Sequence, residues 1–454
     1  MAEIDSSIFK AYDVRGVFPT QINEEIAYKV AQAYVELFKP KTVVLGKDVR
    51  LSGPTMWEAA KNGFIDAGVN VIDIGVISTD MLYFAAANYE CDGGMSITAS
   101  HNPKEYSGIK MVKKGAIPIS GDSGIYTIRD YVIAGKSIKK FIKGRVTRLN
   151  LLDEYCTKIL SFLKPLKKHY KIVANANFGV SGLVLQKLIE KGNLPIELVA
   201  KIDFTPDGNF PKGAPNPMLE DRRTETISTV KELHPDFGIA WDADADRVFF
   251  YDEAGNAIES YFITAILSQY FLHEVEFAKI LCDTRLIYAI QAMCDANHGT
   301  LIINKAGHSF IKETMRKDDV IFGGEMSGHY YFKDFFYADN GMIPLMIMLN
   351  LLENVTKLSD LSNPLTEKYF ISNEKNIEVA SAEKVISFIK NKYHNFANIN
   401  YIDGITFEYE NWRFNLRSSN TEPLIRLNVE SLDKELMERM TREILQDITD
   451  HKND

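Results

Sequence analysis

Three segments of the chain repeat one pattern. Each has a β-branched apolar run, a polar turn, an amphipathic helical stretch and a glycine before a second apolar run, and they begin at Lys41, Lys171 and Lys279. Such strand–loop–helix–strand units are expected to form right-handed βαβ connections. The repetition therefore predicts three α/β domains of similar topology.

The last part of the chain has a different order of elements. A helical stretch at 381–393 is followed by strand-like runs at 404–410, 412–416 and 424–429, and then by a charged helix from Leu432. This order predicts an α+β module with a mostly antiparallel sheet. Length alone suggests about three domains. The repeats raise the expectation to four, at residues 1–146, 147–254, 255–364 and 365–454.

Composition limits the partners that we expect. With 52 Lys and Arg against 61 Asp and Glu, the net charge is −9, whereas a nucleic-acid binder needs a basic face. The four cysteines are widely spaced, the N-terminus is polar and acidic, and the longest apolar run, 342–352, is about half a membrane span. We expect a cytoplasmic monomer or small homo-oligomer with neither nucleic-acid nor membrane partners.

The segment 241–247, Trp-Asp-Ala-Asp-Ala-Asp-Arg, carries the sharpest chemical signal. Asp242, Asp244 and Asp246 are two residues apart, so an extended chain presents all three carboxylates on one side. Their mutual repulsion favours a bound divalent cation, and oxygen-only ligands suit Mg²⁺. A straight strand would spread the three too far, so we expect the segment to curl around the ion.

Two other interpretations of this segment are weaker. An EF-hand loop would have its final ligand at Glu253, but its sixth position requires glycine and is Arg247 here, and the flanking sequences resemble strands. A solvated acidic turn is the remaining alternative, although apolar residues enclose the segment on both sides.

The segment 98–104, Thr-Ala-Ser-His-Asn-Pro-Lys, is expected to form a turn that exposes Ser100. A lone serine in a turn is more often a cap or a hydrogen-bond donor. Beside a metal, however, its oxygen can carry a phosphoryl group, with His101 and Lys110 balancing the charge.

Other segments supply groups that bind phosphate and sugar. Residues 417–421 join Arg417 to three hydroxyls and an amide in a turn, which suits an anion although a polar β-turn needs no ligand. In 323–329, Glu325 and Ser327 lie on one side of the chain and can contact sugar hydroxyls. No Walker A or Gly-x-Gly-x-x-Gly motif occurs, so nucleotide binding has little support.

The segments YDVRG, TASHNP, DADADR, GEMSGH and RSSNTEP occur in this order between about residues 8 and 430. In this respect the chain resembles the α-D-phosphohexomutase family, and most closely its bacterial phosphomannomutases. The resemblance implies four domains around a central cleft: three similar α/β domains with mixed sheets and a C-terminal α+β domain. It also implies a phosphoserine enzyme that interconverts hexose 1- and 6-phosphates through a hexose 1,6-bisphosphate, which also serves as activator.

The resemblance assigns roles to residues of this chain. Ser100 would be the phosphoserine, and its oxygen with Asp242, Asp244 and Asp246 would bind Mg²⁺. The other residues expected at the reacting groups are Arg15, His101, Lys110, Arg247 and His329. Those expected to bind the small-molecule hexose phosphate are Tyr12, Arg285, His308, Glu325, Ser327, Arg417, Ser419, Asn420 and Thr421.

Two positions depart from the family pattern. The family's metal loop usually has glycine between its carboxylates, whereas this chain has Ala243 and Ala245. Alanine can replace glycine if these backbone positions do not need a positive φ, so we expect a competent loop. Arg285 stands where relatives often have lysine, so it keeps the charge but changes its geometry.

Three rival functions remain open at this point. Phosphoglucosamine mutases share the mechanism, but that family usually has glutamine at the position of Met326. A phosphoserine-dependent phosphatase would need neither a sugar-binding segment nor a separate phosphate site. A non-catalytic sugar-phosphate sensor would not need the serine together with all three carboxylates.

Overall fold

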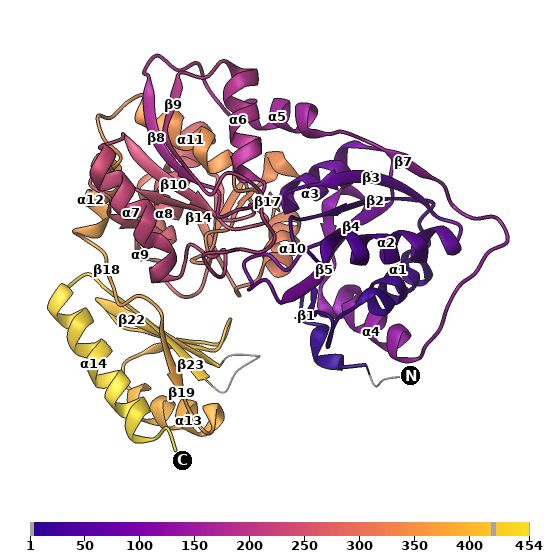
Figure 1. The fold of residues 1–454 in the computed structure, drawn as a ribbon. Helices are drawn as coiled ribbons and strands as arrows, with labels where there is room; N and C mark the ends of the chain where they lie inside the picture. The colour runs from indigo at the N-terminus through magenta and orange to yellow at the C-terminus, as the bar shows by residue number, and fades with distance from the viewer. Residues whose placement is uncertain (1–3, 419–423, 454) are drawn as a thin grey trace. The chain divides into compact units, whose positions relative to one another are not determined.

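The computed structural model describes residues 4–418 and 424–453 (Figure 1). The chain divides into two compact units. Unit one comprises Met1–Ile258, Gly307–Asp318 and Ser327–Leu358. Unit two comprises Glu259–Ala306, Asp319–Met326 and Ser359–Asp454.

The first sheet of unit one is mixed, with strand order β1-β5-β4-β2-β3-β7 and β6 paired to β5. Strands β4, β2, β3 and β7 are parallel, whereas β1, β5 and β6 run antiparallel to their neighbours. The strands are β1 Val14–Val17, β2 Thr42–Lys47, β3 Asn70–Val76, β4 Gly93–Ile97, β5 Tyr106–Lys113, β6 Ile117–Pro118 and β7 Val146–Arg148. The turn that follows β4 carries Ser100.

Helices of the same domain cover this sheet and complete its core. They are α1 Glu24–Phe38, α2 Gly53–Asp66, α3 Thr79–Asn88 and α4 Tyr126–Ile133. The Asn23 side chain caps α1 by accepting a hydrogen bond from the Ile26 amide. Val30 and Tyr34, four residues apart on α1, pack with Phe64 of α2 and Leu45 of β2 in one buried cluster. The βαβ unit predicted from Lys41 onward is thus confirmed as β2-α2-β3.

The second sheet has the order β12-β11-β10-β8-β9. Its parallel strands are β8 Tyr170–Asn175, β9 Ile196–Ile202 and β10 Phe237–Trp241, and its antiparallel strands are β11 Val248–Tyr251 and β12 Ala257–Ile258. The helices nearby in sequence are α5 Leu152–Leu160, α6 Ser181–Gly192 and α7 Glu220–Leu233. The predicted second repeat is observed as β8-α6-β9. The connection between β10 and β11 is the three-aspartate loop, Asp242–Arg247.

Unit one ends with α10 His308–Asp318, the hairpin β16 Tyr330–Phe332 and β17 Ala338–Asp339, and α11 Ile343–Leu352. Helix α11 accounts for the longest apolar run of the sequence, and almost all of its side chains are buried. Among the described helices, none combines the length and apolar character needed to span a bilayer.

Unit two contains the third predicted repeat and the C-terminal module. Strands β13 Lys279–Asp283, β14 Thr300–Asn304 and β15 Phe322–Gly324 are parallel, and α8 Ser260–Glu274 and α9 Tyr288–Ala296 belong to the same part of the chain. The C-terminal sheet is antiparallel, in the order β18-β23-β22-β21-β20 with β19 paired to β23.

The C-terminal module has the predicted α+β composition. Its strands are β18 Phe370–Ile371, β19 Lys375–Glu378, β20 Asn398–Asn400, β21 Ile405–Glu408, β22 Trp412–Ser418 and β23 Leu424–Ser431, and the helices of this region are α12 Ser359–Thr366, α13 Ala382–Tyr393 and α14 Lys434–Asp450. Ile389 of α13 and Ile444 of α14 join Phe414 and Val429 of the sheet in one buried cluster. The α/β fold class inferred from the sequence is confirmed.

Candidate active site

The three-aspartate loop brings its carboxylates together in the interior of unit one. Ligand atoms of Asp242, Asp244 and Asp246 all lie within 4.8 Å of one another, and the three residues are buried. Among the described residues, Asp244 Oδ1 has no hydrogen-bond partner. Burial raises the pKa of Asp242 well above its usual range, and the neighbouring Asp244 and Asp246 raise it further. A divalent cation would relieve this repulsion, so the donor set fits Mg²⁺.

The loop curls as predicted, but one of its two alanines does adopt a positive φ. Ala245 adopts φ +57°, in the left-handed region, whereas the φ of Ala243 is not in that region. An alanine in this region costs about 1–2 kcal/mol because its Cβ approaches the carbonyl oxygen. The chain therefore forms the turn at Ala245 with strain that glycine would not have.

Glycine substitutions at the two alanines are expected to have opposite effects. Ala245→Gly should stabilise unit one by about 0.5–1 kcal/mol, because it removes the left-handed strain. Ala243→Gly should destabilise it by about 0.5–1 kcal/mol, because it only adds backbone freedom. The midpoints of thermal unfolding would measure both effects, and shifts in the same direction would contradict the interpretation.

Glycines from two other segments allow close approach to this loop. A Cβ on Gly179 would lie 2.3 Å from the carbonyl oxygen of Ala243, and one on Gly341 would lie 2.3 Å from that of Ala245. The Trp241 indole also donates a hydrogen bond to the Gly341 carbonyl at 2.7 Å. Two other segments therefore pack closely against the loop, and each contact requires glycine at position 179 or 341.

Ser100 lies directly against the carboxylate cluster. The expectation that the turn exposes Ser100 was wrong: the residue is 1% exposed, because the three-aspartate loop packs against it. Its Oγ is 3.1 Å from Asp242 Oδ2 and 3.2 Å from His101 Nδ1. Its φ is +50°, a strained conformation for serine. The turn after β4 therefore directs the hydroxyl at the aspartates, although the two segments are 142 residues apart.

Arg50 holds the Ser100 turn in place, a role that the sequence did not indicate. Its guanidinium donates to the carbonyls of Ser100 at 2.6 Å, Asn102 at 2.6 Å, Pro103 at 2.8 Å and Tyr106 at 3.1 Å. Arg50 is 2% exposed, and its Nε donates to Asp48 at 3.2 Å. One side chain thus satisfies four backbone acceptors around the candidate nucleophile.

The long loop 205–217 packs beside Arg50. The Arg50 guanidinium lies 5.1 Å from the centre of the Phe210 ring, and the Arg50 backbone forms a parallel bridge with Gly208. Its length and turn-forming residues predict a functional or interface loop. The contact confirms an interface role, because the loop joins the second domain to the Ser100 region of the first.

Predicted cationic residues surround the carboxylates. Lys110 Nζ is 2.8 Å from Asp244 and also pairs with Asp246. Burial alone would lower the pKa of Lys110, but Asp244 and Asp246 raise it above its ordinary value. Arg247 Nε is 3.6 Å from Asp242, and Arg15 Nη1 donates to Asn102 at 2.6 Å. The cluster can therefore receive an anionic group close to Ser100.

Three histidines predicted from the sequence also lie in this region of unit one. His329 Nε2 is 3.4 Å from Asp246 Oδ1, and His329 Nδ1 is 2.8 Å from the Ser327 hydroxyl. Burial lowers the pKa of His101 and His308 well below the ordinary value, and nearby cations lower both further. The His308 ring packs edge-on against Tyr12 at 4.8 Å. The surroundings of His101 and His308 thus disfavour the protonated form of both imidazoles.

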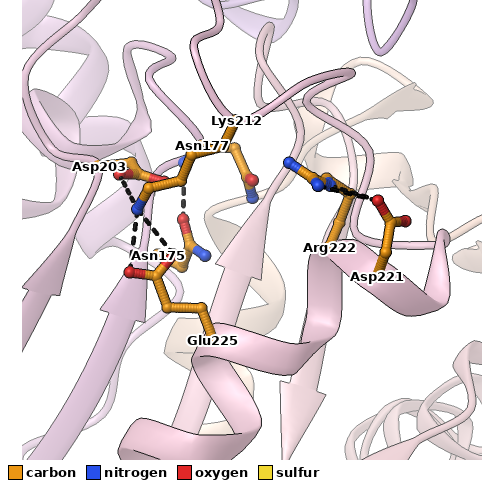
Figure 2. Close-up of a pocket in the computed structure, with 7 residues that line it drawn as sticks. All are labelled: Asn175, Asn177, Asp203, Lys212, Asp221, Arg222 and Glu225. Carbon is orange, nitrogen blue, oxygen red and sulfur yellow. Dashed lines mark hydrogen bonds and ion pairs between the residues drawn. The ribbon is translucent and has the colours of Figure 1, made fainter.

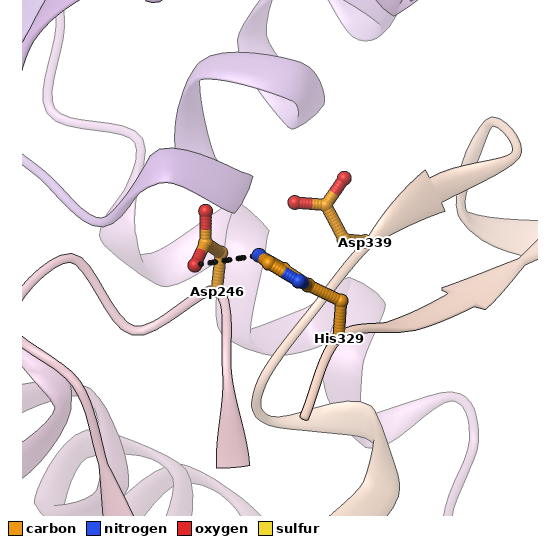
Figure 3. Close-up of side chains that lie close together, drawn as sticks. All are labelled: Asp246, His329 and Asp339. Atoms are coloured by element: carbon orange, nitrogen blue, oxygen red, sulfur yellow. Dashed lines mark ion pairs between the residues drawn. The ribbon is translucent and has the colours of Figure 1, made fainter. Parts of the chain in front are cut away.

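Two buried charges beside His329 were missed by sequence reasoning. Figure 3 shows the Asp339 carboxylate facing His329 and Asp246, and ligand atoms of the three lie within 4.8 Å of one another. Lys312 pairs with Asp339, and Lys312 Nζ lies 3.8 Å from the centre of the Tyr83 ring. The only available signal was that Lys312 follows His308 by four residues on one helix.

Unit two holds the remaining predicted residues. Arg285 Nη2 lies 2.8 Å from Asp283, and Arg285 Nη1 lies 3.4 Å from Glu374. Arg417 and Arg426 also pair with Glu374, at 3.2 and 3.4 Å. Glu374, another residue missed from the sequence, thus gathers three arginines. Glu325 is 4% exposed, and Ser419, Asn420 and Thr421 lie outside the described residues.

A separate polar cavity of about 290 Å³ lies in the second domain (Figure 2). It contains none of the predicted site residues and is lined by Asn175, Asn177, Asp203, Lys212, Asp221, Arg222 and Glu225. Lys212 pairs with Asp203 and Glu225, and Arg222 pairs with Asp221. Asn177 connects the cavity to the strand that precedes the three-aspartate loop, because its side-chain Nδ2 donates to the Trp241 carbonyl at 2.8 Å.

Comparisons with known proteins identify the family. Four phosphoglucomutase/phosphomannomutase family models match: α/β/α domains I, II and III at residues 6–137, 153–255 and 259–369, and the C-terminal domain at residues 374–446. The chain therefore belongs to the phosphoglucomutase/phosphomannomutase family. As a phosphohexomutase, it is an enzyme of the isomerase class that transfers phosphoryl groups.

Individual relatives agree with this result. A phosphomannomutase of Vibrio cholerae serotype O1 is 43% identical over 436 residues, covering 93% of this chain and 94% of its own. One of Escherichia coli K12 is 42% identical over 451 residues, covering 96% and 98%. A crystal structure of a phosphoglucomutase/phosphomannomutase family protein from Burkholderia thailandensis has a TM-score of 0.90 at 29% identity, covering 99% and 98%.

Proposed function

We propose that this enzyme is a phosphomannomutase that interconverts mannose 6-phosphate and mannose 1-phosphate, and that it also accepts glucose phosphates. The observation that carries the proposal is the position of Ser100 Oγ, 3.1 Å from a buried three-carboxylate cluster that cationic side chains surround. The relatives described as phosphomannomutases, 42–43% identical to this chain, support mannose as the sugar.

The reaction begins with a phosphoryl group on Ser100. A free hydroxyl of the hexose phosphate attacks this phosphorus, so that a bond from phosphorus to sugar oxygen forms and the bond to Ser100 Oγ breaks. The proton that the attacking hydroxyl loses balances the proton that Ser100 Oγ gains. His101 is placed to exchange that proton, because its Nδ1 lies 3.2 Å from Oγ. The product of this step is a hexose 1,6-bisphosphate.

In the second step the bisphosphate reorients, Ser100 Oγ attacks the phosphorus of its other phosphoryl group, and the bond from that phosphorus to the sugar oxygen breaks. The freed sugar oxygen gains a proton as Ser100 Oγ loses one. Lys110, Arg15 and Arg247 would balance the charge on the phosphoryl oxygens in both steps. Mg²⁺ held by Asp242, Asp244 and Asp246, with an oxygen on Ser100 as a further ligand, would supply additional charge neutralisation. Added hexose 1,6-bisphosphate would act as activator by phosphorylating Ser100.

The remaining predicted residues would hold the substrate. Glu325 and Ser327 would accept and donate hydrogen bonds to sugar hydroxyls, and Tyr12, His308 and His329 would contact the sugar or its reacting oxygen. The phosphate that does not react would be bound by Arg285, Arg417, Ser419, Asn420 and Thr421. The cluster of arginines on Glu374 supports this assignment, because it supplies the guanidinium groups that a phosphate requires.

The test is to supply the enzyme with labelled glucose 1,6-bisphosphate and Mg²⁺, and to compare mutase rates on mannose 1-phosphate, glucose 1-phosphate and glucosamine 1-phosphate. We expect label on the peptide that contains Ser100 and the highest kcat/KM on mannose 1-phosphate. A clear preference for the amino sugar would replace the mannose assignment. Release of free phosphate at the mutase rate would identify a phosphatase instead.

A further inference from the structure

Residues 133–148 of unit one, from the last residue of α4 through β7, form a cationic stretch that we call the basic segment. It contains Lys136, Lys139, Lys140, Lys143, Arg145 and Arg148, and all six are exposed. No acidic residue occurs between Asp130 and Asp153. In a chain with a net charge of −9, this is a strong local excess of positive charge.

The basic segment also exposes large apolar side chains to solvent. Phe141 is 104% exposed and Ile142 is 80% exposed, with lysines directly before and after the pair. Ile133 and Val146 at its two ends are 50% and 44% exposed. Figure 1 shows the segment as a long excursion along the outer side of the first domain, at the right of the view. Exposed apolar area of this kind favours transfer to an apolar phase.

The backbone of the segment is anchored at several points. The Lys140 amide donates to the Asp66 carbonyl at 2.8 Å, and the Gly144 amide donates to the Ile65 carbonyl at 3.0 Å. A Cβ on Gly144 would lie 1.8 Å from the Val69 carbonyl oxygen, so no other residue fits there. These contacts fix the backbone on both sides of Phe141 and Ile142. The segment therefore loses less conformational entropy when it binds a partner.

Most of the charge in the segment is not neutralised by the protein. Lys143 pairs with Asp66 at 2.8 Å. For the other five cations, residues 4–418 and 424–453 provide no ion pair. A partner for this surface therefore needs a dense array of anions around a region that admits apolar side chains.

We propose that the basic segment binds the surface of an anionic membrane, with Phe141 and Ile142 inserted among the lipids and the cations against the headgroup phosphates. The segment places apolar side chains among cations. This suits a bilayer interface, where anionic headgroups lie over an apolar acyl region. A nucleic acid would match the cations but gives no apolar environment for Ile142. The inference is independent of the proposed function.

Vesicle flotation with the full-length enzyme tests the proposal. One set of vesicles is phosphatidylcholine alone, and the other contains about 30% phosphatidylglycerol, at about 50 mM salt. We expect the enzyme to bind only the anionic vesicles. A K139Q/K140Q variant and an F141S/I142S variant should each bind at least about tenfold more weakly. Mutase activity on soluble substrate should stay unchanged in both variants, because these residues lie outside the proposed catalytic groups.

Phe396→Ser is the matched control, because Phe396 is also fully exposed, at 100%, but lies in unit two. It should bind vesicles like the unmodified enzyme. Failure of the unmodified enzyme to bind anionic vesicles would overturn the proposal, as would equal binding by F141S/I142S. Tighter binding to transfer RNA than to vesicles would also overturn it. Light scattering that shows a dimer lost in F141S/I142S would assign the surface to a second copy of the chain.

Discussion

An S100A variant is expected to lose at least about 10⁴-fold of the mutase kcat/KM and to take up no phosphate from hexose 1,6-bisphosphate. The reason is that Ser100 Oγ, 3.1 Å from Asp242 and 3.2 Å from His101, is the atom that we propose to carry the phosphoryl group. Removing a covalent nucleophile leaves only binding and charge neutralisation, which cannot accept and return a phosphoryl group. Steady-state rates and the intact mass of the incubated protein measure both losses.

Ser181→Ala is the matched control for this variant. Ser181 is also a buried serine of unit one, and its Oγ has no hydrogen-bond partner in the structure. Its loss should leave the mutase rate and the phosphate uptake unchanged. Full bisphosphate-dependent activity in S100A would contradict the central role of Ser100. Retained phosphate uptake with lost turnover would assign the phosphoryl group to a different residue.

The sequence predicted the architecture because the fold is built from local signals that repeat. Hydrophobic periodicity predicts the strands and the helix of three βαβ units, β2-α2-β3, β8-α6-β9 and β13-α9-β14. In each unit the helix ends near a glycine or a residue in the left-handed conformation. The C-terminal antiparallel module likewise follows from short alternating runs. The strand orders could not be read this way, because they depend on pairings between segments far apart in the chain.

The site was predictable where several reactive side chains lie within one short segment. Asp242, Asp244 and Asp246 are an example, and they do cluster in the structure. Residues whose partners lie in another segment of the chain could not be predicted from their sequence neighbours. Lys312 with Asp339 and Glu374 with Arg426 belong to this group, because each charge is explained only by a partner in another segment. The strained φ of Ala245 was missed because it depends on how the loop closes.

Arg50→Met is expected to lower the mutase kcat by about 10²–10³-fold, although Arg50 does not contact the proposed substrate groups. Its guanidinium donates to four carbonyls of the Ser100 turn, at 2.6 to 3.1 Å. Methionine would leave these acceptors without their donors, at about 1–3 kcal/mol for each one that stays buried. The turn should then relax from the strained φ of +50° at Ser100 and move Oγ away from Asp242. A displacement of about 1 Å is enough for a loss of this size.

Arg316→Met separates this effect from general destabilisation. The Arg316 guanidinium also donates to backbone carbonyls of unit one, those of Gly115, Ala116 and Phe336, but not to the Ser100 turn. Both variants should unfold at lower temperature than the unmodified enzyme, whereas only Arg50→Met should lose kcat at a temperature where both are folded. Arg50→Lys should recover little, because one ammonium group cannot serve four carbonyls in the geometry of the guanidinium fork. Equal kcat values for the two methionine variants would show that Arg50 supports the fold alone and does not position Ser100.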